Sequence, residues 1–216
     1  MNFTTDFATW QRIASFKATT SSDAYRPMLN AISLTVKKGT LTVASTNSYV
    51  LAVTRIEVDE ATNGAATVKA PAVARSVSQA RAVAKDHGLS DRFKSIAKIR
   101  DLRVRVELSD DGKRLNATFG DDGLLGVALP IVDGKYPNYE ALIPDLDGVE
   151  LGTKPVAINP DVFRLLGATV PKHGDSYLVM RCQDELKPVV FTSTADPKWI
   201  GMAMTIRLAS TAEVAA

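Results

Sequence analysis

Apolar and polar residues follow two periods in this chain, and together they predict a mixture of helices and antiparallel strands. Residues 102–108 alternate cleanly between apolar and charged side chains, which is typical of a strand with one buried face. Residues 73–85 instead carry Val73 and Val77 on one face and Arg75 on the other, as an amphipathic helix does. We therefore expect helices that lie against half-buried sheets.

Two further helices are indicated by their starts. Residues 4–18 place Phe7 and Trp10 on one face, and Thr4, Thr5 or Asp6 can cap the helix. Asn159, Pro160 and Asp161 form a strong start for a short helix that ends before Pro171. Strands are expected over 29–36, 40–46, 49–58, 65–70, 102–108, 115–119, 124–132, 154–158, 177–182, 188–193 and 199–208.

The order of these elements repeats: a helix and three strands occur three times. Residues 59–64 break the strand pattern, 88–101 are a basic insertion, and 209–216 are a frayed tail. A weak identity accompanies the repeat, because residues 71–75 and 160–164 share the pattern Pro-x-Val-x-Arg. The order favours α+β units whose sheets are antiparallel hairpins with helices on one face.

A proline-rich segment, 133–144, separates the second repeat from the third. Pro137 and Pro144 each lack a backbone donor, while Tyr136 and Tyr139 give the segment apolar surface. We interpret it as a packed connector between two units. The predicted division is a domain of two repeats over 1–144, a half domain over 145–208, and the tail.

Composition places the chain among folded proteins without a membrane span. Its 216 residues include 45% hydrophobic and 23% charged residues, enough for one large or two small cores. We expect a cytoplasmic protein, because no apolar run approaches about 20 residues and the N-terminus lacks a signal pattern. The single Cys182 excludes an internal disulfide, and with His87 and His173 it makes no zinc spacing.

Charge is distributed unevenly although the net charge is only +2. Residues 65–105 contain ten Lys or Arg and three Asp, whereas residues 106–150 contain three Lys or Arg and ten Asp or Glu. This polarity suits a polyanion that approaches from one side. A solvated helix face is the plainer interpretation of Arg75, Arg81 and Lys85 taken alone.

No catalytic motif is found, so we expect neither catalytic residues, a cofactor nor a metal. The sequence has no Gly-rich phosphate loop, no HExxH and no nucleophile elbow. The doublets at 110–111 and 121–122 precede Gly at hairpin turns, where acids are common. The alternative from another class of function is an enzyme with an unrecognised acidic site at these turns.

Four stretches in order carry a resemblance to a known family. They are Arg-Pro-Met-Leu-Asn-Ala-Ile-Ser-Leu at 26–34, Leu-Thr-Val-Ala-Ser-Thr-Asn-Ser-Tyr-Val-Leu-Ala-Val at 41–53, Gly-Lys-Tyr-Pro-Asn-Tyr within the connector, and Met-Ala-Met-Thr-Ile-Arg-Leu at 202–208. The chain resembles the bacterial DNA polymerase III beta sliding clamp over nearly its whole length. Family members usually have three domains of two repeats each, so three repeats imply a shortened relative. The sequence leaves open whether a phage or a cellular genome encodes it.

The resemblance implies a non-enzymatic sliding clamp that tethers replication proteins to duplex DNA. It implies a pocket for short peptides of the replicative polymerase and the clamp loader, formed by Leu29, Thr46, Ser48, Tyr49, Leu51, Pro137, Leu142, Met202 and Met204. The family's Gly-His-Arg is Ser48-Tyr49-Val50 here, and the basic residue common after the connector tyrosine is replaced near Ala141. These departures leave the peptide specificity open. The alternative interpretation is that these residues are plain core at a domain junction.

Together with charge, the resemblance also predicts the DNA contacts and the assembly. The DNA-binding residues would be Arg75, Arg81, Lys85, Arg92, Lys94, Lys98 and Arg164. A homo-oligomeric ring is expected, head to tail, with four copies supplying twelve repeats and three or two copies as alternatives. A truncated relative that captures clamp-binding peptides or a host clamp without encircling DNA is the alternative function.

Overall fold

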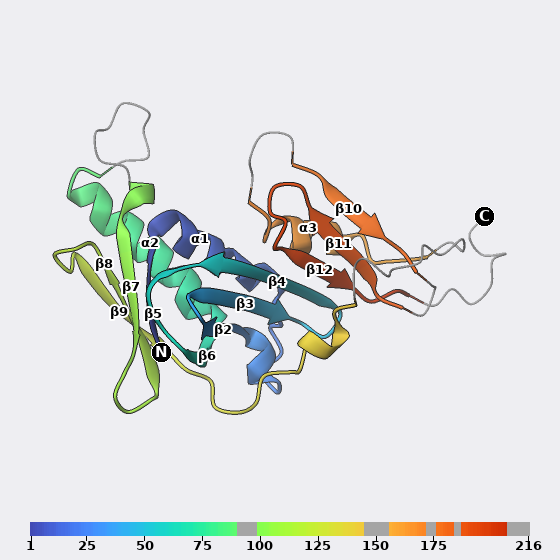
Figure 1. Cartoon of the computed structure of the whole chain (residues 1–216), viewed down its shortest axis with the longest axis horizontal. Helices are drawn as coiled ribbons and strands as arrows, with labels where there is room; N and C mark the ends of the chain where they lie inside the picture. Colours follow the sequence, from blue (N-terminus) through green and yellow to red (C-terminus); the bar gives the residue numbers. More distant parts are fainter. Residues whose placement is uncertain (90–98, 145–155, 172–175, 184–186, 207–216) are drawn as a thin grey trace.

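The computed structural model of the chain is built from two antiparallel sheets and helices packed against them (Figure 1). It describes residues 1–89, 99–144, 156–171, 176–183 and 187–206. The strands are β1 Asn2–Asp6, β2 Ala31–Lys37, β3 Thr40–Thr46, β4 Val50–Glu57, β5 Asp59–Thr62, β6 Gly64–Lys69, β7 Arg103–Leu108, β8 Arg114–Phe119, β9 Leu125–Pro130, β10 Leu178–Arg181, β11 Val189–Ser193 and β12 Ile200–Ala203. The α-helices are α1 Phe7–Ser15, α2 Ala70–Asp86 and α3 Asp161–Gly167, and short 3-10 turns are η1 Phe16–Thr19, η2 Pro27–Asn30, η3 Ile99–Asp101 and η4 Glu140–Leu142. The α+β class predicted from the pattern is confirmed.

The repeating unit has one strand more than the pattern predicted. Each helix follows a leading strand, which is β1 before α1 and β6 before α2. A helix beginning at residue 4 was therefore wrong: residues 2–6 form β1, and Asp6 is the helix cap, its Oδ1 accepting from Thr9 N at 2.7 Å. Pairing of β1 with β7 on one side and β5 on the other overrides the local pattern.

Other differences from the sequence prediction concern strand ends. Residues 59–62 were expected to break the pattern, yet they form β5 at the sheet edge, where Thr4 Oγ1 donates to Glu60 Oε2 at 2.7 Å. The strand predicted over 199–208 ends at Ala203 in β12. Of the strand predicted over 154–158, the described part holds a single bridge, Ala157 to Ile206. The predicted tail 209–216 lies outside the described residues.

The two sheets are assembled from strands of different repeats. One has the order β5-β1-β7-β8-β9 and the other β10-β11-β12-β4-β3-β2-β6. A leading strand therefore always pairs with the first strand after the helix of the other repeat: β6 with β2, and β1 with β7. The third repeat is joined differently, because its third strand β12 pairs with β4, the third strand of the first repeat.

A single apolar core fills the space between the helices and both sheets. Ile32, Leu34 and Val36 of β2 and Val104 and Val106 of β7 are fully buried in it. Trp10 of α1 and Phe119 of β8 meet edge to face at 6.4 Å between ring centroids, and Trp10 Nε1 donates to Ser76 Oγ of α2 at 3.0 Å. α1 and α2 thus lie side by side with their apolar faces inward and their polar faces outward.

Buried polar contacts attach the third repeat to the first. Arg12 of α1 forms an ion pair with Asp196, whose Oδ2 also accepts from Thr54 Oγ1 at 2.7 Å. On the surface, Lys198 Nζ lies 2.7 Å from Glu57 Oε1. Because removing charges from water costs desolvation, we expect the pair of Arg12 and Asp196 to fix the register of the β12 to β4 join more than it adds stability.

Tight packing around Trp199 in the third repeat leads to a stability prediction. A Cβ on Gly201 would lie 2.5 Å from Trp199 Cη2 and 3.0 Å from Leu166 Cδ2. We expect Gly201→Ala to lower the free energy of unfolding by about 1–3 kcal/mol, as overpacking does. Gly126→Ala is the control, since nothing lies within 4 Å of its Cβ. Urea unfolding of the two variants measures the difference, and equal midpoints would contradict the packing around Trp199.

Candidate functional site

The predicted DNA-contacting side chains of α2 are all exposed. Arg75, Arg81 and Lys85 lie on the face opposite the buried residues of α2, and none of the three is ion-paired with another described residue. Arg164 of α3 is exposed too, with its Nε 3.2 Å from Asp161 Oδ1. Arg92, Lys94 and Lys98 lie outside the described residues. Four of the seven predicted DNA contacts are therefore described, and all four are exposed.

Two further cations of the basic span, Arg103 and Arg105, point elsewhere. Arg103 and Arg105 alternate along β7 with the buried Val104 and Val106, so they project from the face of the five-stranded sheet that turns away from the core. Arg103 Nε lies 3.4 Å from Asp121 Oδ1 there. The sequence could not divide the ten cations between these surfaces, because the division depends on which face of each element is buried.

Two of the nine residues predicted for the peptide pocket, Leu51 and Met202, belong to a second apolar cluster on the outward face of the seven-stranded sheet. Leu51 of β4 pairs with Met202 of β12, and both are buried. Tyr139 of the connector covers them, with Tyr136 and Ile143 packed at its sides. The remaining cluster members are Ala44, Val53, Val190 and Ile200.

The predicted pocket residues thus separate into a buried floor and an exposed rim. Leu29, Thr46, Leu51 and Met202 are buried, whereas Ser48 and Pro137 are exposed and Leu142 lies open on η4. On the rim, Tyr49 is 69% and Met204 46% exposed, and the two are tied by a hydrogen bond from Met204 N to Tyr49 O of 2.8 Å. Tyr139 and Ile143 were missed, although the apolar side chains of the connector were a signal for them.

Backbone geometry at the rim agrees with the departure seen in the sequence. Ser48 has a φ of 79°, in the left-handed region that glycine adopts most readily. Its N–H donates to Thr46 Oγ1 at 3.1 Å, and Arg26 Nη1 donates to Ser48 Oγ at 3.3 Å. These bonds hold a non-glycine residue in the turn that presents Tyr49.

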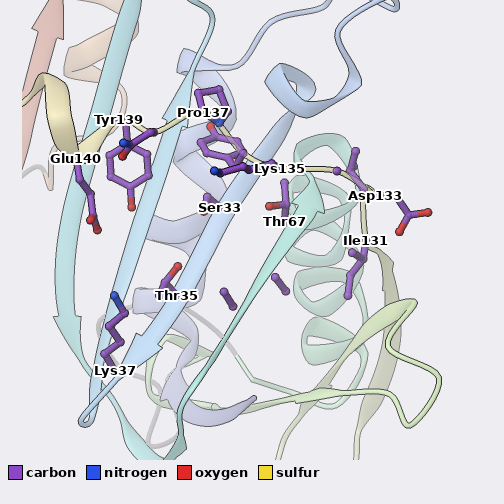
Figure 2. Close-up of a pocket in the computed structure, with 16 residues that line it drawn as sticks. Ser33, Thr35, Lys37, Thr67, Ile131, Asp133, Lys135, Pro137, Tyr139 and Glu140 are labelled. Carbon is purple, nitrogen blue, oxygen red and sulfur yellow. The ribbon is translucent and has the colours of Figure 1, made fainter.

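A polar groove of about 670 Å³ adjoins the connector on the same face of the sheet (Figure 2). Ser33, Thr35 and Lys37 of β2 form its floor, Thr67 of β6 one wall, and connector residues 131–140 the other. Of the predicted pocket residues, Pro137 alone lines this groove. Burial raises the pKa of the Tyr136 phenol above its ordinary value, and the pKa of Tyr139 is raised by burial and then by Glu140. Both phenols stay neutral donors near pH 7.

Acidic clusters give no sign of a metal site in the described residues. Asp111 Oδ1 accepts from Ser109 Oγ at 2.6 Å and from Lys113 N at 3.0 Å, and the Ser109 hydrogen bond, the largest effect, lowers the pKa of its carboxyl. Within the described ranges no three His, Cys, Asp or Glu side chains gather as metal ligands would. Among those same residues no helix is long and apolar enough to cross a membrane.

Repeats of a helix and three strands define the fold: the first two are joined through their leading strands, and the third joins the first through their third strands. No family model and no curated protein matches the chain. Among solved structures, it is similar to a DNA polymerase sliding clamp from Pseudomonas aeruginosa solved with a ligand (14% identity, TM-score 0.68, 96% of this chain and 66% of that chain). It is similar to the DNA polymerase III beta subunit from Thermotoga maritima, with 13% identity and a TM-score of 0.69 over 97% of this chain and 66% of that chain. It is also similar to the sliding clamp from Bacillus subtilis, with 12% identity and a TM-score of 0.69 over 96% of this chain and 64% of that chain.

The resemblance seen in the sequence is therefore confirmed at the level of the fold. The chain has the fold of the DNA polymerase III beta sliding clamps and spans about two thirds of their length.

Proposed function

We propose that the chain is a DNA sliding clamp, a non-enzymatic factor that holds replication proteins on duplex DNA without reading base sequence. The observation that carries the proposal is the set of solvent-facing cations on α2, Arg75, Arg81 and Lys85, within a clamp fold. Exposed Arg and Lys contact phosphates without a base code, so the attraction is independent of sequence and weakens with salt.

The proposed assembly is a closed ring of several copies. Twelve repeats would be supplied by four copies of a chain with three repeats, and an edge strand left open at each end of a sheet is a liability that closure removes. A ring also explains how weak phosphate contacts suffice, because topology rather than affinity retains the protein on DNA.

The proposed partners, besides DNA, are the replicative polymerase and the clamp loader. Their short peptides would dock on the rim of Tyr49, Leu142 and Met204 over the floor of Leu51 and Met202. Half-exposed apolar side chains around a packed floor suit peptides with Leu and Phe anchors, and flexible Met side chains adapt to them.

Retention on circular DNA tests the proposal. Protein that the clamp loader or slow assembly has placed on nicked circular DNA should stay bound through gel filtration at about 0.2 M salt, because a closed ring cannot dissociate from it. Linearising the DNA with a restriction enzyme should release the protein within minutes. Equal retention on both forms would favour a surface binder, and no retention on either, with peptide binding intact, would favour a non-encircling relative that captures peptides or a host clamp.

A further inference from the structure

In the part of the chain that the structure describes, the third repeat lacks the strand that covers the corresponding edge in the other two repeats. The outer edge of β2 is covered by the leading strand β6, and that of β7 by the leading strand β1. β10 is the first strand after the helix of the third repeat, and it ends the seven-stranded sheet (Figure 1). Within the described residues, no strand lies beyond it.

Internal register shows which residues correspond. Val43 of β3 and Phe191 of β11 are fully buried, and each lies two residues before a buried serine, Ser45 and Ser193. Val43 pairs with Leu34 in β2, and Phe191 pairs with Met180 in β10. Met180 therefore occupies the place of Leu34.

Burial differs sharply between these two places. Leu34 is 0% exposed, whereas Met180 is 48% exposed. Phe163 of α3, which meets Phe191 edge to face at 5.9 Å, is also 48% exposed. Both side chains lie at the core face of the third repeat, beside α3. In the first two repeats the corresponding face is covered by two helices, α1 and α2, packed against each other. The third repeat is a half domain with its inner face partly open.

In the described residues, the leading segment of the third repeat pairs with another segment on one side only. Val68 of β6 lies three residues before Pro71, and it bridges Ile131 after β9. Ala157 holds the same place in the third repeat: it lies three residues before Pro160 and bridges Ile206 after β12. On its other side Val68 pairs with Ile32 of β2. For Ala157, no pairing besides the Ile206 bridge exists in the described part of the chain.

We propose that a second copy of this chain completes the half domain, with the leading segment of each copy (residues 156–158) pairing at Leu178 of β10 in the other. The two open features are complementary, since one copy supplies the strand that the other lacks and receives the same in return. Such an exchange is isologous, and a twofold axis relates the two third repeats. The side chains of Met180 and Phe163 are then buried as Leu34 is.

The internal template fixes the register of the exchange. Leu178 lies two residues before Met180, as Ile32 lies two before Leu34, and Ile32 pairs with Val68. Leu178 of one copy should therefore lie opposite Ala157 of the other. Paired residues in antiparallel strands have Cα atoms about 4.5–5.5 Å apart, which is within reach of a disulfide.

This pairing deepens the proposed ring and replaces the head-to-tail order with alternating contacts. A dimer joined through its third repeats has six repeats and leaves β9, the third strand of the second repeat, at both ends. β12 and β4 already show that third strands pair with one another, so two dimers could close a ring through β9. The ring rests on the proposed function, but the dimer contact does not require DNA.

Solution mass and a directed disulfide test the contact. At micromolar concentration, sedimentation should give a dimer or tetramer of the 23.2 kDa chain, and Met180→Lys should halve the mass because it places a charge in the completed core. The control Tyr25→Lys changes a side chain that is 96% exposed and should keep the parent mass. Circular dichroism confirms that each variant is folded.

For the disulfide, Ala157→Cys and Leu178→Cys proteins, each also carrying Cys182→Ser, are mixed and oxidised. A cross-linked dimer should form in the mixture and not with either protein alone, nor when Tyr25→Cys, at a position that is 96% exposed, replaces Leu178→Cys. A monomeric parent, an unchanged mass in folded Met180→Lys, or no cross-link would each overturn the proposal. Retention on circular DNA is measured separately, so a dimer that fails to stay on DNA refutes the proposed function alone.

Discussion

Replacing Arg75, Arg81 and Lys85 together with Glu should abolish binding to duplex DNA at about 50 mM salt. The three side chains are exposed on α2 and make no ion pair with described residues, so their loss changes the surface and not the core. Each phosphate contact removed lowers the slope of log affinity against log salt by about 0.9. Single Ala variants should therefore each reduce that slope by about 1, equally for any DNA sequence.

A matched control has the same change in charge on another face. Arg103, Arg105 and Arg114 are exposed on the five-stranded sheet, and their triple replacement with Glu alters the net charge by the same six units. Fluorescence anisotropy with a labelled duplex should show near-parental binding for this control. If both triple variants lose binding to the same extent, the contact is a nonspecific effect of net charge, and α2 is not the DNA-binding surface.

Met204→Asp should remove peptide binding while leaving the protein folded. Met204 is about half exposed on the rim beside Tyr49, so the carboxylate remains hydrated in the free protein. A docked peptide would cover it and leave a charge without a partner, which is strongly unfavourable. We expect a peptide with Leu and Phe anchors to bind the parent at roughly micromolar strength, about 8 kcal/mol, and the variant at least 100-fold more weakly.

Calorimetry with the folded variant checks this prediction. Ala128→Asp is the control, since Ala128 is exposed on β9 of the other sheet and gains the same charge away from the connector. Its affinity for the peptide should equal that of the parent. Unchanged affinity in Met204→Asp would show that the peptide does not bind at this rim.

Local chemistry in the sequence determined much of the architecture. Asp6 can accept from the first turn of a helix, and it caps α1. Period 3.6 in residues 73–85 placed Arg75, Arg81 and Lys85 outside, because Val73, Val77 and Ala80 on the opposite face are apolar. The order of the elements and the position of the connector were also predicted from the sequence, because turn and proline signals depend only on neighbouring residues.

Tertiary structure decided what depends on partners distant in the sequence. Residues 2–6 became β1 because β7, a hundred residues later, pairs with them, and no local pattern reports that pairing. Burial of Leu51 and Met202 beneath Tyr139 followed from the join of β12 to β4. The open edge of β10 is likewise a property of the sheet, because a strand is an edge only relative to the neighbours that the whole fold supplies.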